Sequence, residues 1–173
     1  MNHYNKNTDI RDVKHNDLRY KFTLRFIDEL HSRVLDIGSR NPITNLIEDQ
    51  FGLDIRNTSR DIDSEPLEGH YNFVLCFEVI EHLMNPLWFL KNVKSILEPN
   101  GALYLSTPIN KPKFLWREDH FHEFDEKRLA HLIEKAGFTV VKQQKVSFNQ
   151  SFGIRPLIRK LSKSGTMFLK LTK

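Results

Sequence analysis

Residues 71–83, YNFVLCFEVIEHL, place two glutamates and a histidine directly behind an apolar run. The run YNFVLCF is apolar on both faces, which is typical of a central parallel strand that helices cover on both sides. Carboxylates and imidazoles are costly to bury without partners, so they seldom follow a buried strand unless they have a function. The stretch therefore predicts a parallel sheet and, at the end of this strand, a functional site.

Strand-like and helix-like segments alternate on either side of this stretch. Apolar strands are expected at 33–38, 51–55, 102–108, 138–148 and 166–173. Helices are expected at 16–30, 41–50, 86–98 and 125–138, with a short basic helix at 156–161. Asn16 and Asp125 are expected to cap the first and last of the longer helices, and Gly137 to stop the last one. The alternation predicts an α/β fold with a doubly wound, mostly parallel sheet and helices on both faces.

Length and composition indicate a single domain. A chain of 173 residues with 13 phenylalanines can bury a full core, so one domain is expected at 16–173, behind a flexible polar arm at 1–15. Cys76 is the single cysteine and lies in the apolar run, so a buried, reduced thiol is expected. No stretch has the roughly 18 apolar residues of a membrane span, and the N-terminus does not resemble a signal peptide. We therefore expect a cytoplasmic protein.

Charge is distributed unevenly along the chain. The net charge is +4 and the pI is near 9.2, yet no acidic residue follows Glu134. The basic residues beyond that point are Lys135, Lys142, Lys145, Arg155, Arg159, Lys160, Lys163, Lys170 and Lys173. Such an asymmetry is compatible with a surface for phosphate, nucleic acid or an anionic membrane face. Because no aromatic interleaving or known binding motif accompanies these charges, the pattern favours a solvated edge.

Acidic residues and a glycine follow the first two expected strands. In doubly wound sheets, ligands bind beyond the carboxyl ends of the strands. Asp36 and Gly38 close the first expected strand, and Asp54 closes the second. Asp54 lies near the spacing at which an acid meets the ribose hydroxyls of an adenosine ligand. Asp61 follows a few residues later, so these residues are expected to line one binding cleft.

The acids and histidine of the central stretch are expected to share that cleft. If a helix starts directly after the strand, Glu78, Glu81 and His82 occupy positions i, i+3 and i+4 and lie on one face. The later segment REDHFHEF adds His120 or His122, in a loop that should fold over the same edge. Such a set forms either a general acid/base group or the ligands of a divalent ion, with oxygen-rich sites favouring magnesium or manganese.

Five segments, in this order and spacing, resemble the class I S-adenosylmethionine-dependent methyltransferases. They are VLDIGS (34–39), LDI (53–55), RDIDSEPLEGHYNFVLCFEVIEHL (60–83), PLWFLKNVKSILEPNGALYLSTP (86–108) and HEFDEKRLAHLIEKAGF (122–138). The resemblance implies a seven-stranded Rossmann-like sheet whose last strand runs antiparallel. Only six residues separate Asp54 from Asp61, where the family normally fits a helix and a third strand. We therefore expect the sheet to be trimmed, to six strands, at this edge.

The same resemblance implies S-adenosylmethionine as the cofactor and assigns residues to it. Asp36, Gly38 and Ser39 match the turn that approaches the methionine part of the cofactor. Asp54 matches the acid that holds the ribose hydroxyls, and Asp61, or alternatively Asp63, matches the position near the adenine. Each of these assignments is an expectation that comes from the resemblance.

Two further residues of the central stretch match the family, and two residues of the first turn depart from it. Phe77 and Glu78 lie where the strand passes beneath the cofactor. The family's first turn has glycines at alternating positions, but Arg40 and Pro42 stand where the second and third would be. Side chains there obstruct close backbone approach, so the two residues bear directly on cofactor binding.

The acids and histidines resemble those of two branches of the family. Glu78, Glu81, His82 and His120 match, position by position, the glutamates and histidines that hold magnesium in small-RNA 3′-terminal 2′-O-methyltransferases. Ubiquinone-pathway O-methyltransferases have a similar stretch, and both branches act on vicinal hydroxyls, which a metal can chelate. Many methyltransferases carry EVIEH without a metal. In that case Glu81, His82 and His120 are the candidate catalytic residues, with His82 or His120 as the base.

The resemblance predicts an enzyme that transfers a methyl group from S-adenosylmethionine, most simply to an oxygen. The acceptor is expected to be a small or medium hydroxylated molecule, or one of glycan or lipid type, and the reaction to proceed with or without a metal. Two alternatives stay open: a non-catalytic binding module that kept the fold, and an RNA-modifying enzyme that uses the basic C-terminal third. No feature of the sequence indicates an oligomeric state.

Overall fold

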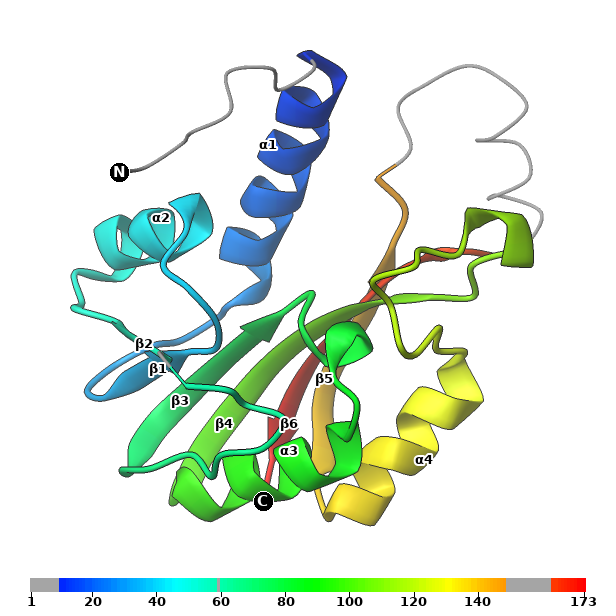
Figure 1. Ribbon diagram of the computed structural model, residues 1–173. Helices are drawn as coiled ribbons and strands as arrows, with labels where there is room; N and C mark the ends of the chain where they lie inside the picture. The colour runs from blue at the N-terminus through cyan, green and yellow to red at the C-terminus, as the bar shows by residue number, and fades with distance from the viewer. Residues whose placement is uncertain (1–9, 59, 149–162) are drawn as a thin grey trace.

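Six strands of the described residues form one sheet in the order β2-β1-β3-β4-β6-β5 (Figure 1). The computed structural model describes residues 10–58, 60–148 and 163–173. The strands are β1 (Val34–Asp36), β2 (Arg56–Asn57), β3 (Tyr71–Phe77), β4 (Leu97–Ile109), β5 (Thr139–Val146) and β6 (Gly165–Thr172). The predicted doubly wound α/β fold is confirmed, with six strands as expected for a trimmed sheet.

Strand direction follows the prediction as well. β1 pairs in parallel with β2 and β3, and β3 pairs in parallel with β4. β6 inserts between β4 and β5 and runs antiparallel to both, so it is the reversed final strand. The carboxyl ends of β1, β3 and β4 therefore meet at one edge of the sheet.

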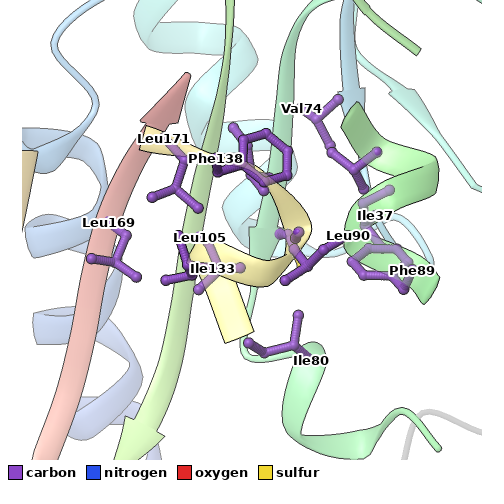
Figure 2. Packing of buried hydrophobic residues seen from close by; sticks show 14 of the residues in the cluster. Ile37, Val74, Ile80, Phe89, Leu90, Leu105, Ile133, Phe138, Leu169 and Leu171 are labelled. Atoms are coloured by element: carbon purple, nitrogen blue, oxygen red, sulfur yellow. The ribbon is translucent and has the colours of Figure 1, made fainter. Parts of the chain in front are cut away.

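Helices cover both faces of the sheet. They are α1 (Ile10–Phe26), α2 (Pro42–Phe51), α3 (Pro86–Ile96) and α4 (Glu126–Ala136), with short 3-10 turns η1 (Ile80–His82) and η2 (Lys113–Leu115). On one face, α3 and α4 pack on the sheet through a core that includes Phe89, Leu90 and Ile133 (Figure 2). The other core lies beneath α1 and α2 and includes Phe26 and Ile47.

Strand residues supply both cores in alternation. Val74 and Cys76 of β3 belong to the core under α3 and α4, whereas Phe73 and Leu75 belong to the core under α1 and α2. Successive side chains of a strand point to opposite faces, so a run that is apolar throughout fits a strand buried on both sides. The predicted burial of Cys76 is confirmed, since the side chain is fully buried.

Some boundaries differ from the prediction. Helix α1 begins at Ile10, so Asn16 is not its cap and residues 10–15 are not part of an arm. Residues 1–9 and the expected helix at 156–161 lie outside the described residues. The PNG turn after α3 is assigned to β4, whose pairing with β3 shifts register between Tyr71 and Phe73. Within the described part of the chain, no helix combines the length and apolar character needed to cross a membrane.

Candidate functional site

The turn after β1 needs glycine at one position. Gly38 has a φ of 102°, a backbone conformation that residues with a Cβ rarely adopt, and a Cβ built there would meet no atom within 4 Å. The turn leads through Ser39, which is exposed, to Asn41, whose side chain accepts a hydrogen bond from the Ile43 N–H at 3.0 Å and caps α2. The sequence therefore builds an open glycine turn in front of a helix N-terminus.

Arg40 and Pro42, which depart from the glycine pattern, flank Asn41, the N-cap of α2. The Arg40 guanidinium pairs with the Glu48 carboxylate farther along α2. Pro42 is the first residue of α2, where its missing N–H costs nothing. Neither residue lines the cavities at the carboxyl edge of the sheet.

Asp36 is buried beneath this turn and is already hydrogen-bonded. Its Oδ2 accepts hydrogen bonds from the Thr44 hydroxyl at 2.6 Å and from the Asn57 amide at 3.1 Å. Burial raises the pKa of Asp36 to about 6, because desolvation outweighs those two hydrogen bonds. In this arrangement Asp36 joins the end of β1 to α2 and to the end of β2.

The prediction that Asp54 closes the second strand is wrong. β2 spans Arg56–Asn57, so the exposed Asp54 precedes the strand and lines a cavity with Ser32 and His70, which flank the amino ends of β1 and β3. Asn57 is the residue at the carboxyl end of β2, where its amide donates to the Gly38 carbonyl at 3.2 Å. Sequence reasoning missed Asn57 because a two-residue edge strand has no periodic signal.

The next two acidic residues are engaged in local hydrogen bonds. Asp61 accepts from the Ser64 hydroxyl at 2.7 Å and from the Asp63 N–H at 3.1 Å, and these hydrogen bonds lower its pKa. Asp63 accepts from the backbone N–H groups of Met84 and Asn85, just ahead of α3. Asp61 is exposed, whereas Asp63 holds the start of α3 in place.

Glu78 ends β3 in a strained conformation. Its φ is 57°, in the left-handed region, so no helix starts directly after the strand and the expected i, i+3, i+4 face with Glu81 and His82 does not form. The preceding residue, Phe77, is half-buried at the end of the strand. The Glu78 carboxylate accepts from the Ser106 hydroxyl at 2.8 Å and pairs with Arg19 at 3.3 Å.

Glu81, His82 and His120 form the polar centre of the site. One ligand atom from each lies within 4.8 Å of the others, and among the described residues this is the group that meets that criterion for a metal ion. Glu78 is not in the group, because its carboxylate faces Ser106 and Arg19. The side chain of Glu81 is 1% exposed and accepts from the Thr107 hydroxyl at 2.9 Å. Burial, together with the nearby charge of Glu78, raises the pKa of Glu81.

The two imidazoles are oriented by groups of the loop after β4. The Nδ1 atom of His82 lies 2.7 Å from the Asp119 carbonyl oxygen, so Nδ1 carries a proton and donates it there. Its Nε2 then has a lone pair and lies 3.9 Å from Glu81 Oε1. The rings of His82 and His120 meet edge to face, with centroids 4.7 Å apart. Burial and the nearby Lys111 lower the pKa of His120.

A cavity of about 480 Å³ opens over this centre. Its lining comes from η1, the loop after β4, the end of β5, the start of β6 and α1. Arg19 and Glu78 line this cavity and also a smaller one of about 150 Å³, which reaches Asn41 and Phe77 near the first turn. Arg19 could not be found from the sequence, because only the packing of α1 brings it to this edge.

The other histidines and loop aromatic residues of this region lie outside the three-residue cluster. His122 donates its N–H to the Glu81 carbonyl and lies outside the three-residue cluster, and His131 is exposed on α4. Phe114 and Trp116 are 65% and 52% exposed, so neither side chain packs in the core. Leu115, between them, lines the larger cavity.

Sequence comparisons point to one kind of domain. The profile of a protein family described as "Methyltransferase domain" matches residues 14–143. The ubiquinone biosynthesis O-methyltransferase of Cereibacter sphaeroides (strain ATCC 17025 / ATH 2.4.3) is 30% identical over 133 residues, or 66% of this chain and 53% of that protein. The protein of the same description from Rickettsia conorii is 39% identical over 59 residues, or 34% of this chain and 19% of that protein. This chain spans about half the length of the Cereibacter relatives it matches.

Solved structures share the fold at low sequence identity. A chain of the solved complex that contains the Haloferax volcanii Trm112 methyltransferase activator superimposes with a TM-score of 0.72 at 15% identity, over 94% of this chain and 92% of that one. The 1,6-didemethyltoxoflavin-N1-methyltransferase of Burkholderia thailandensis, solved with S-adenosylhomocysteine, gives 0.63 at 16% identity, over 94% and 81%. An O-methyltransferase from a Brevibacillus brevis multienzyme, also with S-adenosylhomocysteine, gives 0.65 at 13% identity, over 97% and 80%.

Proposed function

The chain belongs to the methyltransferase domain family, and on this premise we propose that it transfers a methyl group from S-adenosylmethionine to a hydroxyl oxygen of a small acceptor. The observation that carries the proposal is the cluster of Glu81, His82 and His120, which faces a cavity that shares Arg19 and Glu78 with the cavity near the glycine turn. The names of the curated relatives, ubiquinone biosynthesis O-methyltransferases, support oxygen as the methylated atom.

The cofactor is proposed to lie along the carboxyl edge of β1, β2 and β3. The turn at Gly38 and Ser39 would approach its methionine part, and Arg19 supplies a cation beside that turn for the methionine carboxylate. The end of β2, at Asn57, and the exposed Asp61 would face the ribose and the adenine. Two fold neighbours, those from Burkholderia and Brevibacillus, were solved with S-adenosylhomocysteine, which supports this class of cofactor.

Glu78 is proposed to join the cofactor side of the site to the acceptor side. It lines both cavities, and its carboxylate contacts Ser106 and Arg19. Strained residues such as Glu78 concentrate at ligand-binding positions, where the surrounding structure holds them in place. The sulfonium of the cofactor would then be presented to an acceptor in the larger cavity.

Methyl transfer requires an in-line approach and removal of one proton. The acceptor oxygen attacks the methyl carbon, a C–O bond forms as the S–C bond breaks, and the products are a methyl ether, S-adenosylhomocysteine and a proton. His82 Nε2 and His120 lie at the centre of the cavity lining, so either imidazole can accept that proton. Thr107 and the Asp119 carbonyl hold Glu81 and His82 in position for this work.

The residues present also fit a divalent cation. His82 presents a lone pair at Nε2, because its Nδ1–H is held by the Asp119 carbonyl, and Glu81 adds a buried carboxylate oxygen. Two imidazole nitrogens with one carboxylate suit manganese or another transition metal better than magnesium. A bound cation would lower the pKa of the acceptor hydroxyl and hold a neighbouring hydroxyl beside it. Glu81, His82 and His120 would hold it, without Glu78.

The surroundings of the cavity favour a planar acceptor that carries neighbouring hydroxyls. Phe114 and Trp116 are exposed on either side of Leu115, which lines the cavity. Exposed aromatic side chains at the margin of a polar site can pack against a flat ring while its hydroxyl groups enter. A catechol combines a flat ring with vicinal hydroxyls, so it is the first acceptor to test.

A methyl-transfer assay tests the proposal directly. The purified protein and S-adenosylmethionine labelled in its methyl group are incubated with a catechol or, in a parallel series, with an RNA that has a free 3′ end, each with Mn²⁺ or with a chelator. We expect labelled methyl ether, a loss of at least tenfold in the His82→Gln variant, and little change in the matched His131→Gln variant, which alters an exposed histidine on α4. Absence of transfer to catechols and to RNA 3′ ends, by protein that is shown to be folded, would contradict methyl transfer to a vicinal hydroxyl.

A further inference from the structure

His120 lies between two side chains of opposite charge. Its Nδ1 is 3.2 Å from Glu123 Oε1 and also 3.2 Å from Lys111 Nζ, and Lys111 Nζ is 3.7 Å from Glu123 Oε1. The side chains are 4%, 9% and 20% exposed for His120, Glu123 and Lys111. Water therefore has little access to this triangle, and the protein groups themselves must satisfy Nδ1.

The two neighbours demand opposite tautomers of the ring. A neutral imidazole carries one N–H proton. If Glu123 is the partner, Nδ1 donates and Nε2 is left with a lone pair. If Lys111 is the partner, Nδ1 accepts from the ammonium and Nε2 carries the proton. Only the first tautomer can offer Nε2 of His120 to a cation, so the choice of partner decides whether the ring can be a ligand.

His82, the other imidazole of the cluster, has no such choice. Its Nδ1 faces the carbonyl oxygen of Asp119, a group that can only accept, so its tautomer is fixed by the backbone. Glu123 is itself held, because Oε1 also accepts the N–H of Arg117 at 3.2 Å. Of the two imidazoles, therefore, only His120 has a tautomer that depends on side chains. Glu123 favours the tautomer that can bind a cation at Nε2, and Lys111 favours the tautomer that cannot.

We propose that Glu123 is a positioning residue for His120 and that Lys111 is its built-in competitor, holding His120 in the tautomer that cannot bind a metal ion. This inference rests on the proposed function, since it concerns the ligand set named there. For Nε2 of His120 to bind a divalent cation, its proton would have to leave and Nδ1 would have to take one up, so that Nδ1–H would donate to Glu123 and the ammonium of Lys111 would lose its acceptor. Lys111 lines the larger cavity, so its ammonium is then available to an oxygen of the acceptor.

Metal affinity in two loop variants tests the competition. In Lys111→Met, which keeps the length of the side chain and removes its charge, we expect Mn²⁺ to bind about tenfold more tightly than in wild type. In Glu123→Ala, affinity should fall about 10- to 100-fold, with partial rescue in Glu123→Gln, whose amide oxygen can still accept from Nδ1–H. Free Mn²⁺ measured by electron paramagnetic resonance gives the affinities. Lys113→Met and Glu118→Gln, at exposed positions of the same loop, are the matched controls.

The tautomer itself can be read without any metal. Long-range ¹H–¹⁵N spectra of the metal-free protein should show Nδ1–H for His120 in Lys111→Met and Nε2–H in Glu123→Ala. The same His120 tautomer in both variants, or a Lys111→Met protein that binds Mn²⁺ no more tightly than Lys113→Met, would overturn the inference. A failure to bind S-adenosylhomocysteine or to transfer methyl groups would instead overturn the proposed function, and would leave the tautomer result as it stands.

Discussion

Glu78 is one of four described residues other than glycine that have a positive φ. A glutamate at a φ of 57° is in the left-handed region, which costs roughly 1–2 kcal/mol for a residue with a Cβ. The conformation is held by the Ser106 hydroxyl, by Arg19 and by the Glu78 N–H, which donates to the Ser106 carbonyl at 2.9 Å. The strained backbone conformation of Glu78 therefore occurs where its carboxylate lines both cavities.

Replacing Glu78 by glycine or by alanine separates the strain from the carboxylate. Both changes remove the carboxylate, but glycine adopts the left-handed conformation freely, so Glu78→Gly should be more stable than Glu78→Ala by about 1 kcal/mol. Both variants should bind S-adenosylhomocysteine more weakly than wild type. Urea unfolding and calorimetric titration provide the two readouts.

At an ordinary helical position, the alanine variant should be more stable than the glycine variant, the reverse of the order expected at position 78. Glu134 lies exposed in α4, where glycine is expected to be about 1 kcal/mol less stable than alanine. If alanine is the more stable residue at position 78 as well, the left-handed conformation of Glu78 is not a source of strain.

Among the elements, α1 carries Arg19 to the site and is fixed to the sheet at its other end. Directly after α1, Asp28 and Glu29 each accept a hydrogen bond of 2.8 Å from Lys170, which is buried on β6. The Tyr104 hydroxyl donates to Asp28 as well. Partial desolvation opposes ionisation of Asp28, but the hydrogen bonds from Lys170 and Tyr104 outweigh it and lower its pKa to about 2.

Lys170→Met should loosen this attachment. It removes two charge-assisted hydrogen bonds but keeps most of the apolar packing. Because the two carboxylates are about half exposed, water replaces part of the loss, so the free energy of unfolding should fall by about 1–2 kcal/mol at pH 7. Lys135→Met, on the exposed side of α4, should change it by less than about 0.5 kcal/mol.

The free energy of unfolding that is lost in Lys170→Met should depend on pH in a definite direction. The pKa of Asp28 is lower in the folded protein than in the unfolded chain, so its stabilising effect is present above about pH 4 and disappears as the pH falls through 2. The difference between wild type and Lys170→Met should therefore be largest above about pH 4 and shrink toward pH 2 in urea unfolding. A difference that grows on acidification would contradict this role of Asp28.

Helices whose ends are set by a capping residue or a glycine could be predicted from the sequence. A strand whose position depends on pairing with another strand could not. Asp125 caps α4 by accepting the Arg128 N–H at 2.8 Å, and Gly137 ends it with a φ of 81°. Both residues act within a few positions of themselves, so the sequence shows them. β2 has two residues at the sheet edge, and its position depends on pairing with Leu35 and Asp36. No local pattern places it, which is why Asp54 was expected at its end.

At the scale of the whole molecule, the composition of the cluster could be predicted but its geometry could not. Glu81, His82 and His120 are brought together as expected, although His120 is far from the others in the sequence. The exclusion of Glu78 follows from its backbone conformation and from Arg19 on α1. Lys111 and Glu123 were missed, because nothing in a polar loop shows which side chains will contact a buried histidine.

Because the sheet is trimmed at its β2 edge, the glycine turn after β1 is the main part of the proposed cofactor site that can be tested. Asn57 and the Thr58 hydroxyl, 2.7 Å from the Gly38 nitrogen, close this turn from the β2 side. Gly38 and Gly52 both have positive φ and open space around the position of a Cβ, but Gly52 ends α2, away from the cavities. They form a matched pair, because alanine brings backbone strain at both positions, but only at Gly38 would its methyl group lie where the cofactor is proposed to approach.

Calorimetric titration with S-adenosylhomocysteine of the wild type, Gly38→Ala and Gly52→Ala tests the central claim, a working cofactor site at the turn after β1. We expect one molecule to bind wild type with micromolar affinity, Gly52→Ala to bind equally well, and Gly38→Ala to bind at least tenfold more weakly. No binding by folded wild-type protein, or equal binding by the two variants, would contradict a cofactor site at this turn.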